Sequence, residues 1–348
     1  YLESIGLDFG PDLNAYTSFD ETVYMLQVPT DDDEKMNKAF QILGDWAHNL
    51  SLEDEEIDKE RGVVIEEWRL GQGANMRMIN EQLPVMLKDS KYAKRLPIGQ
   101  KAVLDTFKYE TVSKFYHDWY RPELMAVIAV GDFEKSEIEK LIMQHFKDIP
   151  KSNTPTQRPF IPVPDHKETL FSIASDPEAS YSSVRLIHKF VRETDNASEA
   201  AFRRGVIFNL YNGMISSRLD ELTKSAEPPF LFARSSKHSW VQSKQMYTLS
   251  AYVKTNGIPE GLESLVTESI RVQKHGFTQS ELNREKAKYL RNLEVQYNEK
   301  DKTESENYKW QYKSHFIEGK SIPNIEYVFD AVKEIMPGIS LKDLNQLS

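Results

Sequence analysis

Alternating apolar and polar residues predict two strands near the start of the chain. The strands cover Leu13–Thr17 and Glu21–Val28, with Ser18–Asp20 as the turn between them. Apolar residues then recur at helical spacing, which predicts helices over 32–49, Met76–Leu87, Glu110–Tyr120 and Ser136–Phe146. The run Leu124–Val130 is apolar throughout, and we expect it to form a buried strand.

A similar order of elements follows a proline-rich stretch. Five prolines within residues 150–168 predict a semi-rigid linker. Beyond it the pattern predicts strands over Ser183–Phe190, Phe230–Trp240 and Met246–Thr255, and helices over Ala197–Lys224 and near 258–275, 278–298, 302–317 and 324–336. The repeated order indicates an α+β protein with two homologous αβ domains, 1–149 and 169–348, each a mostly antiparallel sheet packed against helices.

The two domains are offset in their order of elements. The second opens with a strand that the first lacks, and the first ends with a strand, 124–130, that the second lacks. We therefore expect both domains to be truncated at the ends of this fragment. Tyr1–Ile5 reads as the last turn of a helix that Gly6 ends, which predicts further chain upstream.

An acidic helix between the first two predicted helices carries the candidate chemistry. Ser51 is a candidate N-cap and Gly71 can end the helix. At about 100° per residue, Glu60 and Glu67 fall almost in line on one face, among apolar residues. Glu66 lies about 100° to one side, towards the polar face. Gly62 within this helix suggests the close approach of another backbone or of a ligand.

Carboxylates on an apolar stripe leave two interpretations open. A stripe that faces the core is normally uncharged, and buried carboxylates persist mainly when they are paired or bound to metal. Glu60 and Glu67 are therefore candidates for a metal site. The alternative is two buried glutamates neutralised by arginine or lysine.

Composition narrows the class of protein. The 348 residues are 39% hydrophobic and 28% charged, which is typical of a globular protein with room for two domains. The net charge of −10 argues against nucleic acid or an anionic membrane as the main partner. No apolar run approaches the ~20 residues of a membrane span. Cysteine is absent from the sequence, which excludes disulfides and a thiolate zinc site.

Several segments together resemble one known family. They are Gly10–Thr17 with Glu21–Tyr24, Glu60–Glu67, Leu96–Gly99, Trp119–Pro122, Val130–Asp132, Ser217–Leu219 and Pro228–Ala233. In this order they are similar to the pitrilysin/insulinase zinc metallopeptidases, which include the mitochondrial processing peptidases. These enzymes are inverzincins, named for an H-x-x-E-H motif. The chain is most similar to the long bacterial members, which are exported to the periplasm or cell envelope.

The resemblance implies roles for the two glutamates. Glu67 corresponds to the zinc ligand of the downstream motif, and Glu60 to its supporting acidic residue at the catalytic site. The chain has no H-x-x-E-H, and its eight histidines are scattered. Zinc needs about four ligands. We therefore expect this fragment to be inactive alone and to lack zinc, with the missing motif upstream of Tyr1.

The resemblance also implies a substrate and a way of binding it. The parent protein would be a zinc-dependent endopeptidase that cleaves peptides or small unfolded proteins held as an added edge strand. Asn14, Ala15, Tyr16 and Thr17 would form that edge; without the resemblance they read as an ordinary hairpin. The C-terminal half of the same polypeptide would complete the enzyme. Arg218 is expected to be a structural ion-pair partner of nearby acids.

Two non-catalytic functions remain open. Inactive members of the family act as partner subunits. A peptide-binding scaffold would use the same sheet edge without hydrolysis.

Overall fold

The computed structural model describes residues 8, 10, 12–152 and 155–347. The chain divides into two compact units, Tyr1–Glu178 and Ala179–Ser348. The predicted end of a helix at Tyr1–Ile5, with Gly6 as its stop, lies outside the described residues.

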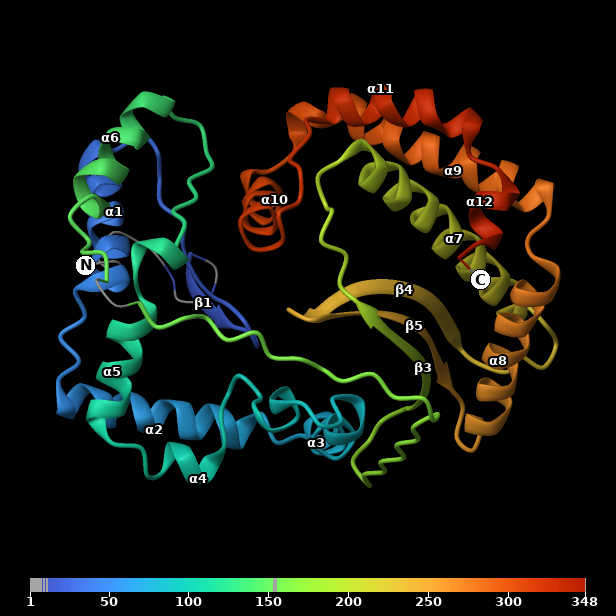
Figure 1. Ribbon diagram of the computed structural model, residues 1–348, viewed down its shortest axis with the longest axis horizontal. Coiled ribbons are helices and arrows are strands. Elements are labelled where there is room, and N and C mark those ends of the chain that lie inside the picture. Colours follow the sequence, from blue (N-terminus) through green and yellow to red (C-terminus); the bar gives the residue numbers. More distant parts are fainter. Residues whose placement is uncertain (1–7, 9, 11, 153–154, 348) are drawn as a thin grey trace. The chain divides into compact units, whose positions relative to one another are not determined.

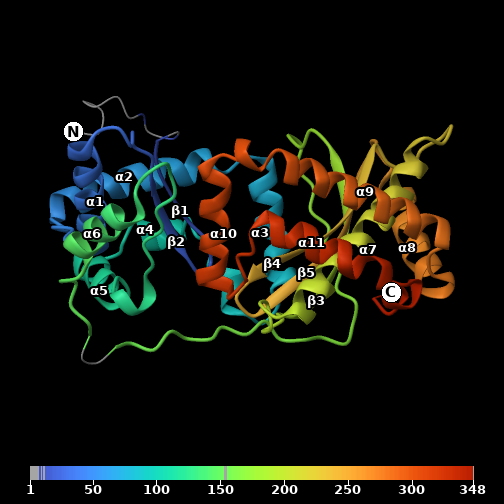
Figure 2. The same ribbon diagram turned by 90° about the horizontal axis from the view of Figure 1, so that it is seen from above.

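The described residues of unit 1 form a two-stranded hairpin and six α-helices. Figures 1 and 2 show these elements. Strands β1 (Leu13–Thr17) and β2 (Thr22–Leu26) are antiparallel, with Leu13 opposite Leu26 and Thr17 opposite Thr22. The helices are α1 (Asp33–His48), α2 (Asp54–Leu70), α3 (Ala74–Met86), α4 (Lys101–Leu104), α5 (Tyr109–Trp119) and α6 (Lys135–Phe146). The predicted hairpin and helices are thus confirmed. Helix α4 was not predicted because one turn is too short to show a period.

The core of unit 1 forms where α1 packs against α6. Met36, Phe40 and Ile138 are buried there, and Val127 and Ala129 pack against them. The predicted strand over Leu124–Val130 is wrong: Pro122–Leu124 form a 3₁₀ turn, and the residues after it join no sheet. The segment still alternates, since Ile128 is exposed between Val127 and Ala129. Its apolar residues fit a strand, but the described strands of unit 1 pair only with each other.

The chain from 155 to 178 is attached to unit 1 at intervals. Arg121 donates hydrogen bonds to the carbonyls of Thr156 and Asp118. Lys88 pairs with Glu168 at 2.8 Å. The side chain of Arg77, in α3, binds both carboxylate oxygens of Asp176, at 2.6 and 2.7 Å, and that of Glu178 at 2.6 Å. These contacts hold the segment against unit 1 up to the last residue before unit 2.

Unit 2 is a three-stranded sheet with helices against it. The strands are β3 (Ser182–Val191), β4 (Phe232–Val241) and β5 (Lys244–Val253), in the antiparallel order β3-β5-β4. The helices are α7 (Glu199–Thr223), α8 (Ile258–His275), α9 (Gln279–Asn298), α10 (Ser305–Glu318), α11 (Ile325–Ile335) and α12 (Leu341–Asn345). All strands and helices predicted for this half are confirmed, and α12 is added.

One face of this sheet forms the core of unit 2. Long helix α7 runs beside it, with α9 and α11 beyond (Figure 1). Leu249 and Ala251 of β5 are buried with Leu210 and Leu219 of α7. The chain is therefore an α+β protein with two αβ units, as predicted. None of the described helices has the length and hydropathy needed to cross a bilayer.

Candidate functional site

Helix α2 begins and ends through local backbone geometry. Leu52 has a positive φ of 51°, which turns the chain so that Glu53 becomes the N-cap. The prediction that Ser51 caps this helix is therefore wrong. The acidic first turn, Asp54 to Glu56, suits the positive end of the helix dipole. Gly71 ends the helix, as predicted.

Arg61 fixes α2 to the rest of unit 1. Its guanidinium donates hydrogen bonds to the carbonyls of Leu104 and Phe107, at 2.8 and 3.0 Å, and lies 3.8 Å from the centre of the Phe107 ring. Ile57 is buried on the same side of the helix. The sequence analysis missed this anchor, because nothing local distinguishes Arg61 from the other charged residues of the helix. The contacts determine which face of α2 stays open.

Glu60 and Glu67 both lie on or beside that open face. Each is exposed, so the expected burial of the two carboxylates is wrong. Glu67 lines a shallow hollow with apolar neighbours, among them Val63 and Leu70, which are 59% and 74% exposed. Glu66 lies at the same hollow but is paired with Arg69 at 2.8 Å. Glu67 thus presents a carboxylate without a side-chain partner among the described residues, on an apolar surface.

The hollow also explains the position of Gly62, which lines it. A Cβ built on Gly62 would meet nothing within 4 Å. Of the two expectations for Gly62, the close approach of another backbone is therefore not found in the described chain, and the approach of a ligand stays a prediction. Room therefore exists beside Glu67 for a further segment or ligand.

A zinc site needs about four ligands close together. In the described parts of the chain, no three histidine or acidic side chains are grouped so that they could hold a metal ion. Several histidines bind elsewhere: His145 contacts Asn37, and His166 contacts the carbonyl of Glu168. The described residues therefore do not fit a complete zinc site. They offer Glu67 as one ligand at most.

Strand β1 has an outer edge that no described strand covers. Gln27 donates to the carbonyl of Asp12 and Ser18 to that of Glu21, so residues 12, 14, 16 and 18 bond towards β2. Ala15 and Thr17 consequently turn their amides to the outer edge. The Ala15 amide donates to Oδ1 of Asn14 at 2.8 Å.

Tyr16 and Thr17, the other two residues of the predicted edge, also make side-chain hydrogen bonds. The Tyr16 hydroxyl donates to the Glu21 carboxylate at 2.8 Å, and the Thr17 hydroxyl lies 3.3 Å from that of Thr22. Asn14, Ala15 and Thr17 are exposed, whereas Tyr16 is half-buried. Asn14 to Thr17 thus form one accessible strand with two outward-facing amides.

Arg218 belongs to a buried ion cluster in unit 2. Its guanidinium binds Glu268 at 2.8 Å and also binds Glu281, and it lies 4.8 Å from the centre of the Phe277 ring. The side chain of Glu268 is only 5% exposed. Arg218 is therefore the structural ion-pair partner that the sequence analysis expected.

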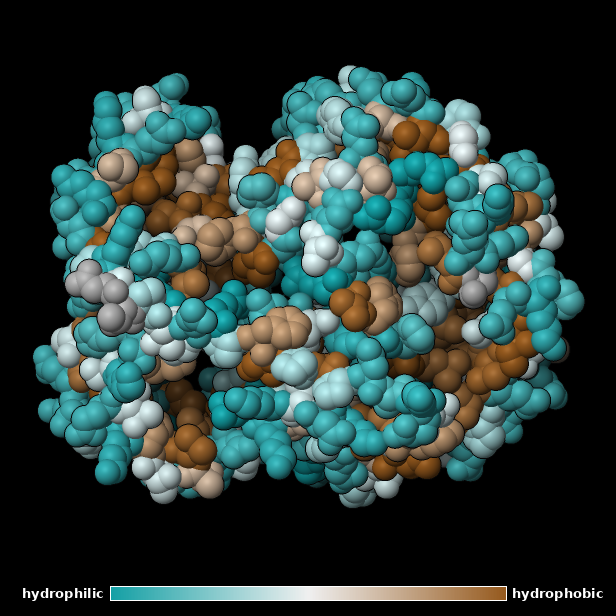
Figure 3. Space-filling view, viewed as in Figure 1, coloured by the Kyte–Doolittle hydropathy of each residue, from teal (hydrophilic) through white to brown (hydrophobic). Residues whose placement is uncertain are grey.

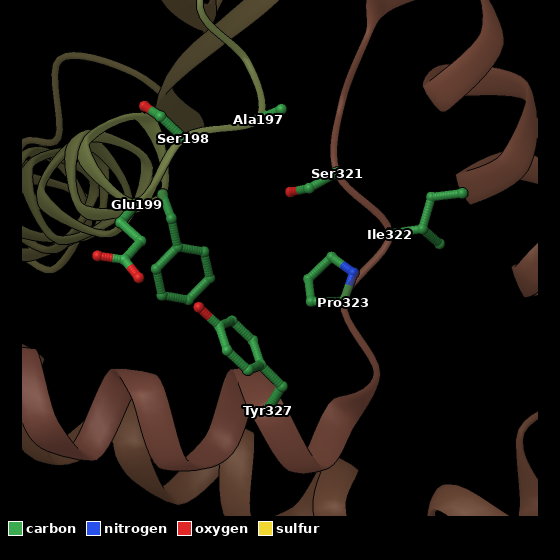
Figure 4. A pocket seen from close by; sticks show the side chains of 8 residues that line it. Ala197, Ser198, Glu199, Ser321, Ile322, Pro323 and Tyr327 are labelled. Atoms are coloured by element: carbon green, nitrogen blue, oxygen red, sulfur yellow. The ribbon is translucent and has the colours of Figure 1, made fainter.

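A second hollow, of about 340 Å³, lies at the start of α7 (Figure 4). The side chains of Ser321 and Pro323 lie across it from Ser198 and Glu199, whereas that of Ile322 points away. Ser198 is engaged as the N-cap of α7, since its hydroxyl accepts from the Ala201 amide. The Ser198 hydroxyl also donates to the Asp195 carboxylate at 2.5 Å, and we assign no chemistry to this hollow.

The surface of the molecule shows apolar areas among hydrophilic ones (Figure 3). The exposed large apolar side chains include Phe160 and Phe171, which are 67% and 79% exposed.

Comparisons with known proteins place this geometry in a family. The profile described as Insulinase (Peptidase family M16) matches residues 1–93, and the profile described as Peptidase M16 inactive domain matches residues 106–289. A "Zinc protease PQQL-like" of Arabidopsis thaliana is 34% identical over all of this chain, and "Probable zinc protease PqqL" of Escherichia coli is 29% identical over 86% of it.

The fold agrees with a solved structure of the same group. The first half of the periplasmic protease PqqL from Escherichia coli matches with a TM-score of 0.91 and 25% identity, covering 99% of this chain and 74% of that one. The chain spans about a third of the length of the curated relatives, 34% and 32% in the two cases above. Both family profiles and the relatives agree on one assignment: the chain belongs to the M16 insulinase family of zinc peptidases.

Proposed function

We propose that this chain is part of a zinc-dependent endopeptidase, to which it contributes one metal ligand and a substrate-binding strand. The observation that carries the proposal is the Glu67 carboxylate, which is exposed on an apolar hollow and has no side-chain partner in the described chain. Relatives over the same region are named zinc proteases. An exposed carboxylate among apolar residues is available to a metal ion brought by another segment.

Glu67 is the proposed ligand, and Glu60 the proposed supporting residue. Glu60 lies two helical turns away, about 10 Å along the axis, too far for both to bind one zinc directly. Its carboxylate could instead orient another ligand by a hydrogen bond. We place the remaining ligands outside these 348 residues, and we expect these residues alone to hold zinc weakly and to hydrolyse nothing.

The proposed substrate is a peptide or a small unfolded protein in extended form. It would pair with the outer edge of β1, where Ala15 and Thr17 turn their amides outwards. Backbone hydrogen bonds of this kind depend little on the sequence of the peptide, so side-chain pockets would determine any sequence preference. A peptide carbonyl would replace Oδ1 of Asn14 as the acceptor of the Ala15 amide.

The rest of the enzyme would come from the same polypeptide. Since the relatives are about three times as long, we propose that a C-terminal half completes the active site. We also propose an exported location, as stated for the Escherichia coli protein.

The metal ligand is tested in the whole protein by Glu67→Gln with Glu66→Gln as a matched control. Glu67→Gln is expected to lower bound zinc and cleavage of a quenched fluorescent peptide by at least tenfold. The thermal stability of the zinc-free protein should be unchanged, because the side chain is exposed. Glu66→Gln should retain both, since Glu66 pairs with Arg69. Full zinc content and activity in Glu67→Gln would refute its role. Peptide binding without zinc in the wild type would support a non-catalytic subunit or scaffold.

The substrate strand is tested by two variants with opposite expectations. Ala15→Pro removes an amide that faces outwards, so it should raise KM several-fold without unfolding the hairpin. Asn14→Ala frees the Ala15 amide from its internal acceptor and should lower KM. Equal KM values for both variants would contradict strand addition at β1.

A further inference from the structure

The outer edge of β3 is uncovered in unit 2. β3 stands at one end of the strand order β3-β5-β4, so no described strand lies on its far side. The Arg192 amide donates to the Ser243 carbonyl at 3.5 Å, so the even-numbered residues of β3 bond towards β5. The amides of Ser183, Ile187 and Val191 consequently turn to the outer edge. Native proteins usually keep open edge strands short, whereas β3 has ten residues.

The hydrophobic core is incompletely covered beside this edge. Leu249 and Ala251 of β5 face the helices and are 3% and 0% exposed. Leu186 and Val184 of β3 lie opposite them and therefore face the same way. Both pack against the core but are only partly buried. The core thus ends at β3 in a rim that is open to solvent.

Helix α8 lies over this end of the core. A Cβ built on Gly261 would stand 2.5 Å from Cγ1 of Val253 and 3.5 Å from Cγ1 of Val184, so α8 crosses β5 and β3. Helix α7 contacts β4 instead. Along the sheet, α8 is therefore on the β3 side and α7 on the β4 side.

One flank of α8 is apolar and accessible. Glu268 points to α7, where it pairs with Arg218 at 2.8 Å. At about 100° per residue, a row of four apolar residues lies on the flank turned away from that pair. We call this row the open flank: Ile258, Leu262, Val266 and Ile270. Three of the four are large side chains that are 44%, 36% and 42% exposed, in the order Ile258, Val266 and Ile270. Since α7 is on the opposite side, the open flank faces the uncovered edge of β3.

The two units lack opposite members of one pair of elements. Unit 2 begins with strand β3, for which the described part of unit 1 has no counterpart. Unit 1 ends with the apolar segment Leu124–Val130, for which unit 2 has no counterpart among the described residues. If the two units repeat the same order of elements, a counterpart of that segment in unit 2 would come after Ser348.

The chain leaves unit 2 next to α8. The Phe277 amide, just past the end of α8, donates to Oδ1 of Asn345 in α12 at 3.2 Å. Figures 1 and 2 mark the C-terminal end beside α8. The curated relatives are about three times as long as this chain, which spans 34% and 32% of two of them. Polypeptide that follows Ser348 would therefore start close to the open flank.

We infer that an apolar strand of the polypeptide following Ser348 pairs with the outer edge of β3 and packs on the open flank. Its backbone would bond the outward amides of β3, and its inward side chains would cover Val184 and Leu186. The inference rests on the proposed function only in taking this chain as part of a longer polypeptide. Its consequence for binding is that the β3 edge is closed in the whole protein and does not compete with β1 for an extended peptide.

The test is hydrogen–deuterium exchange of the β3 amides, measured on the 348-residue chain and on the whole protein. The whole protein is expected to exchange the outward amides of Ser183, Ile187 and Val191 at least tenfold more slowly, because a neighbouring strand would bond them. Equal exchange of these amides in the two proteins would overturn the inference.

Two neighbouring residues of α8 give a matched pair of variants. Val266 lies on the open flank, whereas Thr267 is exposed on the solvent side of the helix. In the whole protein, Val266→Asp should speed exchange of the outward amides at least tenfold, because it places a charge under the added strand. Thr267→Asp should change it less than twofold. Equal effects of the two variants in the whole protein would contradict packing on the open flank.

A second variant keeps the test valid if Val266→Asp prevents folding of the whole protein. Ser183→Pro removes an outward amide, so in the 348-residue chain, where no described strand bonds it, Tm should be unchanged. In the whole protein the same change would remove a hydrogen bond between strands and should lower Tm by several degrees. An unchanged Tm in both would count against pairing at β3.

The identity of the added strand is tested with a synthetic peptide of the sequence that directly follows Ser348. Added to the 348-residue chain, it should slow exchange of the outward amides, and a scrambled peptide should not. Protection in the whole protein but not by this peptide would mean that another segment covers β3. A 348-residue chain that sediments as a dimer, and as a monomer after Val266→Asp, would assign the surface to a second copy; either result makes the inference wrong.

These measurements involve neither zinc nor hydrolysis. Their failure would leave the peptidase proposal standing, and a whole protein without zinc or activity would leave the exchange results unaffected.

Discussion

Gly213 in α7 lies directly against the carboxylate of Glu285 in α9. A Cβ at position 213 would stand 2.0 Å from Oε1 and 2.4 Å from Cδ of that glutamate. Glu285 is buried, and α7 and α9 pack together. The absence of a side chain at Gly213 therefore makes room for a carboxylate within the helix interface.

Gly213→Ala is expected to destabilise unit 2 by about 1–3 kcal/mol, because the buried Glu285 side chain must move. Alanine favours a helix by ~1 kcal/mol over glycine, so a net loss of stability in Gly213→Ala would show that the clash with Glu285 outweighs this gain. Gly205→Ala in the same helix is the control: nothing lies within 4 Å of its added Cβ, so it should stabilise the protein. Urea denaturation of both variants measures the difference, and equal stability would mean that Glu285 rearranges freely.

Arg218→Met should destabilise unit 2 by about 3 kcal/mol or more. The change leaves the buried Glu268 carboxylate without its closest partner, and an uncompensated buried charge is strongly unfavourable. Arg271→Met is the control: Arg271 also contacts Glu268, at 3.4 Å, but its side chain is 64% exposed. The control should lose less than ~1 kcal/mol. Similar losses in both variants, measured by guanidinium denaturation, would argue against the buried pair.

The same cluster predicts an acid transition. The Arg218 guanidinium, with the hydrogen bonds from Thr278, lowers the pKa of Glu281 from 4.5 to about 2. A lowered pKa in the folded state contributes stability that is present above pH 4.5 and lost as the pH falls towards 2. Glu281→Gln should therefore reduce the change in Tm between pH 4.5 and pH 2, while lowering Tm at pH 7. An unchanged pH profile in Glu281→Gln would exclude this carboxylate as a source of the transition.

Arg77→Gln should loosen the segment just before Ala179 from helix α3. Arg77 binds Asp176 and Glu178, which precede the boundary at Ala179. Asp176 is 10% exposed, so loss of its partner frees a largely shielded side chain. Limited proteolysis should cleave within residues 170–180 several times faster in Arg77→Gln. Lys88→Gln removes the exposed ion pair with Glu168, and it should increase the rate of cleavage within residues 170–180 by less.

Most of the secondary structure could be predicted from the sequence, because apolar residues recur clearly at helical or strand spacing. Helix α1 and the β1–β2 hairpin appear where the pattern places them. The failure at Leu124–Val130 has a physical cause: an apolar pattern shows that residues can be buried, whereas a strand also needs a hydrogen-bonded neighbour.

The candidate site was only partly predictable for a related reason. Helical spacing shows that Glu60 and Glu67 share a side of α2, but it does not show whether another element covers that side. The structural roles of Arg61 and Gly213 come from contacts with residues more than forty positions away in the sequence. A local sequence pattern does not contain such contacts.

The hydrogen bond from the Ala15 amide to Asn14 has a consequence for solubility. An uncovered strand edge invites the edge of a second copy, which is a route to aggregation. By occupying one outward amide with its own side chain, Asn14 withholds a donor from such self-association. Concentrated Asn14→Ala protein should then form sheet-rich aggregates sooner than the wild type, because the freed amide can pair with the strand edge of a second copy.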